Sequence, residues 1–195
     1  GFAYEAFQSA TGRQDALDWY VSADMTQRND QFDGNGNRIP QDTSQGSNMD
    51  TETYDLQGRF GYELDADKKL SLPLQDYKDQ QDTGYTKASI NGEAVAVKGL
   101  NLDDQPYTHN QAVNLNYADK DFYGQGLQVE SYWRRADALF FPDLSRGRAG
   151  VSDNNSVQDV YGLRAAIDTP LPSIGNATGN LVWGHDRLIV LLGVE

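Results

Sequence analysis

Residues 17–26 read Leu-Asp-Trp-Tyr-Val-Ser-Ala-Asp-Met-Thr. Apolar side chains stand at every second position, and the set is Leu17, Trp19, Val21, Ala23 and Met25. Only a β-strand places alternate side chains on the same face. This stretch therefore predicts a strand with one apolar face and one more polar face.

The same alternation recurs along the chain and predicts about eight antiparallel strands. They cover about residues 1–10, 15–28, 51–64, 70–83, 113–119, 127–135, 157–167 and 179–186. Short turns are expected at 11–14, 65–69, 120–125 and 169–178, and long polar loops at 29–50, 84–107 and 138–155. Short turns alternate with long loops along the chain, so all long loops fall at one end of the sheet. That asymmetry is typical of an up-and-down outer-membrane β-barrel.

Two observations separate a membrane barrel from a soluble β-sandwich, whose strands also alternate. Several predicted strands exceed ten residues, whereas strands average about five or six. Aromatic residues also gather near the short turns, as in a girdle at a membrane boundary. They are Phe60, Tyr62, Tyr117, Phe122, Tyr123 and Tyr161. The sequence thus favours an all-β transmembrane barrel segment.

The composition excludes several classes of function. The chain has 29 acidic and 16 basic residues and a net charge of -13, which argues against a nucleic-acid partner. It has no cysteine, and its two histidines, His109 and His185, lack metal-ligand spacing. We therefore expect no cofactor and no metal site. No Ser-His-Asp constellation can be placed, so we expect no enzymatic activity.

No apolar run approaches the roughly 18 residues of a membrane-spanning helix. The longest, Leu188 to Leu192, is far shorter. A barrel stays compatible with this composition because half of every strand faces a polar lumen. The chain begins at Gly1 without a signal peptide, from which we expect a processed or cut piece.

Several segments resemble parts of the barrels of TonB-dependent siderophore receptors. They are 28–37 (RNDQFDGNGN), 82–85 (DTGY), 98–106 (KGLNLDDQP), 132–135 (YWRR), 139–142 (LFFP) and 159–164 (DVYGLR). The likeness is greatest to receptors of the ferric aerobactin and schizokinen type, which take up citrate-hydroxamate siderophores. It covers about residues 19–186.

This resemblance implies part of a 22-stranded barrel in the bacterial outer membrane, in contact with lipid and lipopolysaccharide. Such receptors hold an N-terminal plug domain that couples to TonB, and no plug sequence is present here. We therefore expect residues 1–186 to be a partial receptor barrel, an internal fragment, and 187–195 to be an atypical C-terminal tail. The alternative is a small, self-contained eight-stranded barrel with a structural or adhesive role, closed by pairing 1–10 with 179–186.

The resemblance also implies a ferric siderophore as ligand, bound by aromatic faces and hydrogen-bond donors in the long loops. The candidate contacts are Tyr85, Tyr107, Arg134, Arg135, Phe140, Phe141, Arg146 and Arg148. Alternatively, the arginines pair with Asp137, Asp143 and Asp153 or with lipopolysaccharide phosphates.

Two further patterns resemble functional sites, but we prefer a structural interpretation of each. Residues 33–37 (DGNGN) resemble the start of a calcium loop, but the twelfth position is Ser44 rather than glutamate, so we expect turn-forming residues. Inward carboxylates such as Asp18, Asp24, Asp55 and Glu63 resemble an acid–base pair. We expect them instead to line a hydrated lumen, with cross-strand partners such as Arg59.

Overall fold

A computed structural model describes residues 2–40, 50–82, 84–98, 105–140, 154–174, 177–184 and 187–194. Nine strands form one antiparallel sheet: β1 (Ala3–Gln14), β2 (Leu17–Arg28), β3 (Thr51–Glu63), β4 (Lys68–Gln81), β7 (Tyr107–Phe122), β8 (Gln125–Phe140), β9 (Asn154–Ile174), β10 (Ala177–Gly184) and β11 (Arg187–Val194). Two more strands, β5 (Tyr85–Ile90) and β6 (Glu93–Lys98), form a separate hairpin. No helix suited to crossing a bilayer occurs in the described ranges.

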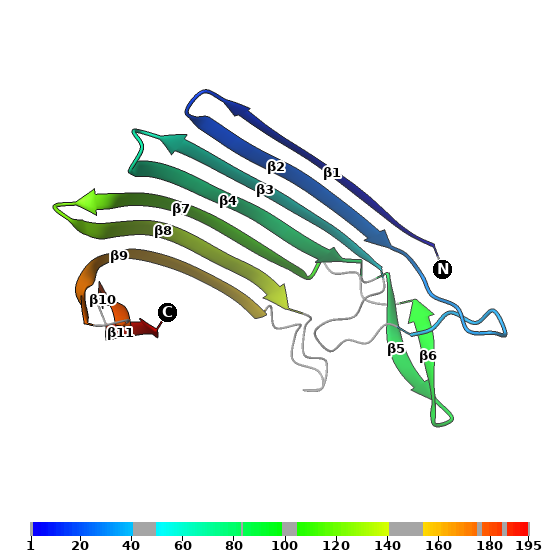
Figure 1. Cartoon of the computed structure of the whole chain (residues 1–195). Helices are drawn as coiled ribbons and strands as arrows, with labels where there is room; N and C mark the ends of the chain where they lie inside the picture. The colour runs from blue at the N-terminus through cyan, green and yellow to red at the C-terminus, as the bar shows by residue number, and fades with distance from the viewer. Residues whose placement is uncertain are drawn as a thin grey trace.

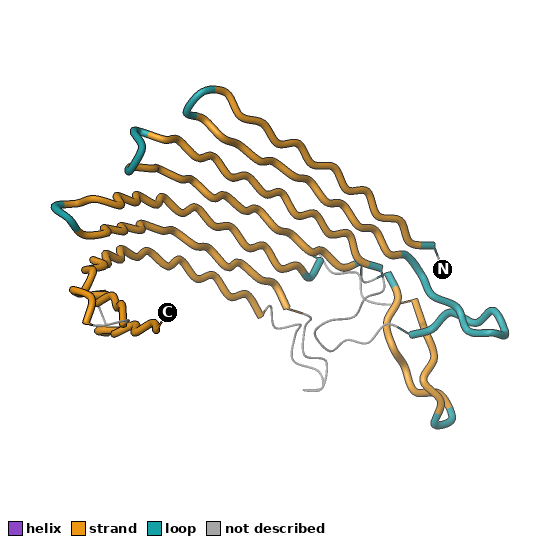
Figure 2. The backbone as a smooth tube through the Cα atoms, viewed as in Figure 1, coloured by secondary structure: helices purple, strands orange, loops and turns teal. Residues whose placement is uncertain are grey.

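The nine-stranded sheet is up-and-down, because each strand pairs with its neighbours in the order β1-β2-β3-β4-β7-β8-β9-β10-β11. The turns that follow β1, β3 and β7 lie together at one end, and the β5–β6 hairpin lies at the other (Figure 1). Figure 2 shows in teal the short turns at one end of the strands and the longer connection after β2 at the other. The prediction of an antiparallel up-and-down sheet, consistent with a barrel segment, is confirmed.

The register places the alternating residues of all long strands on two common faces. One, here called the apolar face, carries Leu17, Trp19, Val21, Met25, Leu56, Phe60, Tyr62, Leu70, Leu72, Leu74, Val113, Leu115, Tyr117, Val129, Trp133, Tyr161 and Leu163. The other, the polar face, carries Asp18, Tyr20, Ser22, Asp24, Arg59, Asn114, Asn116, Glu130, Tyr132, Arg134 and Arg164. The predicted alternation therefore holds across the sheet.

The apolar face has no second layer over it among the described residues, where no apolar side chain is buried. Leu115 is 49% exposed and Leu163 69% exposed. Soluble monomers rarely expose apolar patches larger than a few hundred Å². A face of this kind requires an apolar environment outside the chain.

The first turn lies later than the sequence predicts. β1 continues through the predicted turn at 11–14, and the chain reverses at Asp15, which has a left-handed φ of 51°. Gly12 belongs to the strand because the Trp19 indole lies over it; a Cβ on Gly12 would approach Trp19 to 2.5 Å. The glycine thus marks an aromatic packing site rather than a turn.

The second long loop contains the β5–β6 hairpin, where no strand was predicted. Asn91 and Gly92 have φ values of 53° and 83°, as a two-residue type I′ turn requires. The Asn-Gly pair was a usable signal for it. The described residues form eleven strands, nine of them in the main sheet, where about eight were predicted.

The turn predicted at 169–178 is shorter than expected, because β9 extends through Pro170 to Ile174 and β10 begins at Ala177. Residues 187–194 form β11, which pairs with β10, so this part of the expected tail is a strand. Within the described part of the chain, β1 pairs with β2 alone, and the sheet is open. This arrangement lacks the closure that a self-contained barrel needs.

Candidate functional site

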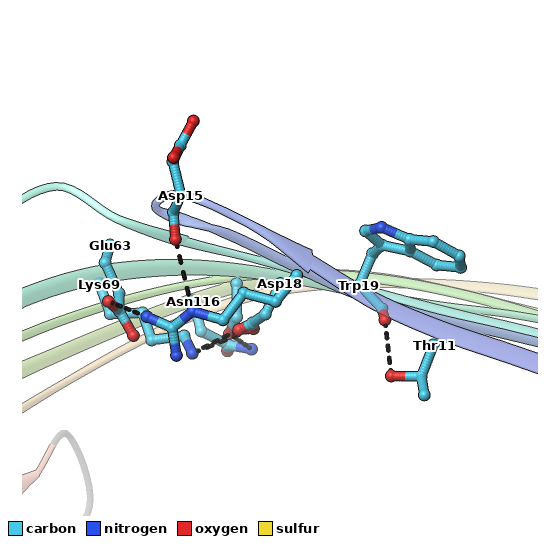
Figure 3. A network of polar contacts seen from close by, with 9 residues as sticks. Thr11, Asp15, Asp18, Trp19, Glu63, Lys69 and Asn116 are labelled. Carbon is cyan, nitrogen blue, oxygen red and sulfur yellow. Dashed lines mark hydrogen bonds and ion pairs between the residues drawn. The ribbon is translucent and has the colours of Figure 1, made fainter.

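Ion pairs fix the polar face near the short turns. Lys69 Nζ lies 2.7 Å from Asp18, and Arg13 Nη2 lies 2.7 Å from Glu63. Figure 3 shows Asp18, Lys69 and Asn116 on one side of the sheet and the Trp19 ring on the other. Two of the four predicted carboxylates, Asp18 and Glu63, thus have cross-strand partners, and these are Lys69 and Arg13 rather than Arg59.

A tyrosine flanked by two arginines lies farther along the polar face. The guanidinium carbons of Arg134 and Arg164 lie 5.2 and 5.3 Å from the centre of the Tyr132 ring. Arg164 also lies 3.9 Å from Glu130, whereas Arg134 has no carboxylate within ion-pairing distance among the described residues. Arg134 is therefore a cation available to an anionic partner.

Glycine and asparagine shape the surroundings of this cluster. Tyr132 lies over Gly162, where a Cβ would approach the ring carbon Cζ to 2.0 Å. Asn114 pairs with Tyr132 in the register, and its Oδ1 is buried without a hydrogen-bond partner in the described part of the chain. β4 and β7 lose register pairs beside it at Leu72 and Pro73, because proline has no N–H to donate. An acceptor without a hydrogen-bond partner and a guanidinium without an ion-pair partner thus lie on the same face of the sheet.

The structure separates Arg134 from Arg135, which were both predicted as ligand contacts. Arg135 lies on the opposite face of β8, with its Nη2 3.5 Å from Asp137. Tyr107 donates to the same carboxylate at 2.9 Å. The alternative that an arginine pairs with Asp137 therefore holds for Arg135.

The other predicted contacts are spread over three places. Tyr85 opens β5, and its ring lies 3.6 Å below the guanidinium of Arg38. Phe140 ends β8. Phe141, Arg146 and Arg148 lie outside the described residues. Tyr132 and Arg164 were not among the predicted contacts. Positions 132 and 134 lie two residues apart on one strand, so their side chains share a face, and this spacing was a usable signal for Tyr132.

The calcium-like segment is organised by its own aspartate. Asp33 Oδ1 accepts hydrogen bonds from the backbone N–H groups of Asn35 and Asn37 at 2.9 and 2.8 Å. The Asn37 side-chain amide binds Oδ2 at 3.1 Å, and these bonds hold the pKa of Asp33 below its ordinary value. The carboxylate is thus used inside the turn, and the described ranges contain no cluster of metal-ligand residues.

Sequence comparison identifies curated relatives of this chain, and three of them are each 29% identical to it. The chain is 29% identical over 148 residues to the rhizobactin receptor of Rhizobium meliloti strain 1021, which covers 70% of this chain and 20% of that receptor. It is 29% identical over 168 residues to the ferric aerobactin receptors of Klebsiella pneumoniae and Escherichia coli, covering 80% of this chain and 23% of each receptor.

The chain therefore spans about a fifth of the length of the curated relatives it matches. No protein-family model and no solved structure matches it. By sequence, and over most of its own length, this chain is a homologue of a segment of the rhizobactin and ferric aerobactin receptors.

Proposed function

We propose that the chain forms a wall segment of a TonB-dependent receptor that binds and imports a ferric siderophore across the bacterial outer membrane. Its similarity to three siderophore receptors over 70–80% of its length carries the proposal. The two-faced sheet with an exposed apolar side supports it independently.

In this role the apolar face contacts lipid, and the polar face lines the lumen. A bilayer offers no water to unpaired backbone groups, so only a closed barrel spans it with strands. The two edge strands, β1 and β11, then pair with further strands of the same barrel. Coupling to TonB passes through a plug domain that the described residues do not include.

Growth on iron tests this function. The full-length gene is expressed in a strain that lacks its own hydroxamate-siderophore receptors, and growth is scored with each ferric hydroxamate as the only iron source. We expect rescue by at least one citrate-hydroxamate siderophore, and no rescue when TonB is deleted. Growth on none of them contradicts the proposed function.

Arg134 gives a residue-level prediction. Replacing Arg134 by Gln removes the unpaired cation beside Tyr132, so we expect siderophore affinity to fall about ten- to a hundredfold, the equivalent of a charge-assisted hydrogen bond of about 1.5–3 kcal/mol. Equilibrium binding of a ferric siderophore to the purified receptor measures this change.

Arg135→Gln is the matched control, since Arg135 is the next residue on the same strand and lies on the opposite face. Its affinity should stay within about twofold of the parent. Equal losses in both variants would mean that the effect is not specific to the polar face of β8, and would contradict a ligand contact by Arg134.

A further inference from the structure

Four charged or aromatic residues join two segments that are far apart in the sequence. Arg38 forms ion pairs with Asp30 and Asp50, and its guanidinium lies over Tyr85 at 3.6 Å from the ring centre. The side chains of Arg38 and Asp50 are only 15% and 12% exposed. Asp30 and Arg38 belong to the segment after β2, whereas Tyr85 begins the β5–β6 hairpin (Figure 1).

Backbone bonds hold this contact at the base of the long loops. The N–H of Ile39 donates to the carbonyl of Gln31 at 2.8 Å, which closes residues 31–39 into a compact turn. The N–H of Asp82 donates to the carbonyl of Asp50 at 2.7 Å, which ties Asp50 to the end of β4. Backbone hydrogen bonds therefore fix the chain positions of both Arg38 and Asp50.

The charges in this group do not balance. Asp30 and Asp50, when both are ionised, carry two negative charges against the one positive charge of Arg38. Arg38 and Asp50 have little access to water, whereas Asp30 is 38% exposed. Both carboxyl groups lie on the Arg38 guanidinium, and a hydrogen bond between them requires a proton on one of the two. Burial, followed by this bond, raises the pKa of Asp50 to about 6, although Arg38 opposes the rise. The other charged side chains around the same hollow are Arg28, Glu52 and Asp82.

We propose that Asp30, Arg38, Asp50 and Tyr85 form a proton-dependent clasp that holds residues 29–40 against the β5–β6 hairpin and tightens as the medium becomes acidic. When Asp50 is protonated, Asp30 and Arg38 remain as a balanced ion pair, and the Asp50 hydroxyl donates to Asp30. When Asp50 is ionised, two carboxylates repel each other beside a single guanidinium.

The sign of the effect follows from the position of the proton. Asp50 binds its proton more tightly in the closed clasp than in an open loop, where its pKa returns to about 3.8. Closure therefore strengthens as pH falls through about 6, and weakens above it. Between about pH 7.5 and pH 5, the ratio of closed to open molecules rises about tenfold.

The clasp also limits how Tyr85 can take part in binding. Arg38 covers one face of its ring, so a ligand in the loops can stack only on the other face. The clasp itself needs no siderophore, and its failure in a test would leave the proposed receptor function untouched.

A distance measurement between the two segments tests the clasp. The chain has no cysteine, so spin labels can be attached at Gly34→Cys and Ser89→Cys alone. Gly34 has open space around its Cα, and Ser89 is exposed on β5. In the full chain in detergent, pulsed electron paramagnetic resonance should show the short-distance population rising at about pH 5 relative to about pH 7.5, with a closed-to-open ratio changed about tenfold.

Three variants make the result specific. Arg38→Gln should abolish the short-distance population at both pH values, and Asp50→Asn should keep it while removing its pH dependence. Asp82→Asn is the control: it alters a neighbouring carboxylate that bonds the N–H of Gly84 and forms no ion pair with Arg38, so the pH response should persist.

Arg38→Lys keeps the positive charge but loses the planar guanidinium that stacks on Tyr85 and pairs with two carboxylates, so we expect a weaker clasp. If the parent is closed at both pH values, this weaker clasp still allows the change of the closed population with pH to be measured. Distances that are independent of pH in both the parent and Arg38→Lys would overturn the proposal. A pH response that survives Asp50→Asn would overturn it as well.

Discussion

Replacing Leu115 by Arg is expected to destabilise the protein in a lipid bilayer by about 2–4 kcal/mol, the cost of an arginine at the membrane midplane. Leu115 is 49% exposed on the apolar face of β7 and lies across from Ser131 in the register. No acidic side chain pairs with these two positions, so the new charge would face hydrocarbon without a partner. The free energy of unfolding from lipid vesicles, titrated with denaturant, measures the loss.

The adjacent substitution Asn116→Arg supplies the control. Asn116 lies on the polar face and pairs with Glu130, so an arginine there meets water and a carboxylate. It breaks only a 3.4 Å hydrogen bond to Ser71, and we expect a change within about 0.5 kcal/mol. If Leu115→Arg is tolerated as well as Asn116→Arg, the apolar face does not contact lipid.

The sheet and its two faces could be predicted because they depend on local alternation. The set from Leu17 to Met25 shares a face in the structure, and so do Val113, Leu115 and Tyr117. A one-residue slip would move each set to the opposite face, so the alternation fixes the register as well as the strand.

Errors arose where one residue type serves two purposes. Gly12 suggests a turn, but it is the floor on which Trp19 packs, and the reversal occurs at Asp15 instead. Pro170 suggests the end of a strand, yet it stands inside β9. Whether such a residue lies in a turn or within a strand depends on its pairing with the neighbouring strand, and residues nearby in the sequence do not reveal that pairing.

The candidate contacts were predicted by residue type and without regard to face. Arg134 and Arg135 are adjacent, and adjacent residues of a strand point in opposite directions, so the sequence contained the information that separates them. The contact of Arg38 with Tyr85 was beyond sequence reasoning, since 47 positions separate the two residues and no periodic pattern connects them.

Gly162→Val is expected to destabilise the sheet by about 1–3 kcal/mol, because the Tyr132 ring occupies the space that any side chain at position 162 requires. A Cβ there would lie 2.0 Å from Cζ and 2.2 Å from the hydroxyl oxygen, so the ring must swing away and leave Arg134 and Arg164.

Denaturant unfolding in detergent measures the cost of Gly162→Val, and a double-mutant cycle assigns its cause. In a Tyr132→Ala background the three ring atoms nearest to the valine Cβ are absent, so most of the penalty should disappear. Gly58→Ala is the control, since its nearest heavy atom is Phe60 Cε2 at 3.5 Å, an ordinary contact, and its backbone is not left-handed. That variant should be neutral or stabilising, because alanine restricts the unfolded chain more than glycine does. An equal penalty for Gly162→Val with and without Tyr132 would mean that backbone strain, and not the tyrosine ring, requires glycine at this position.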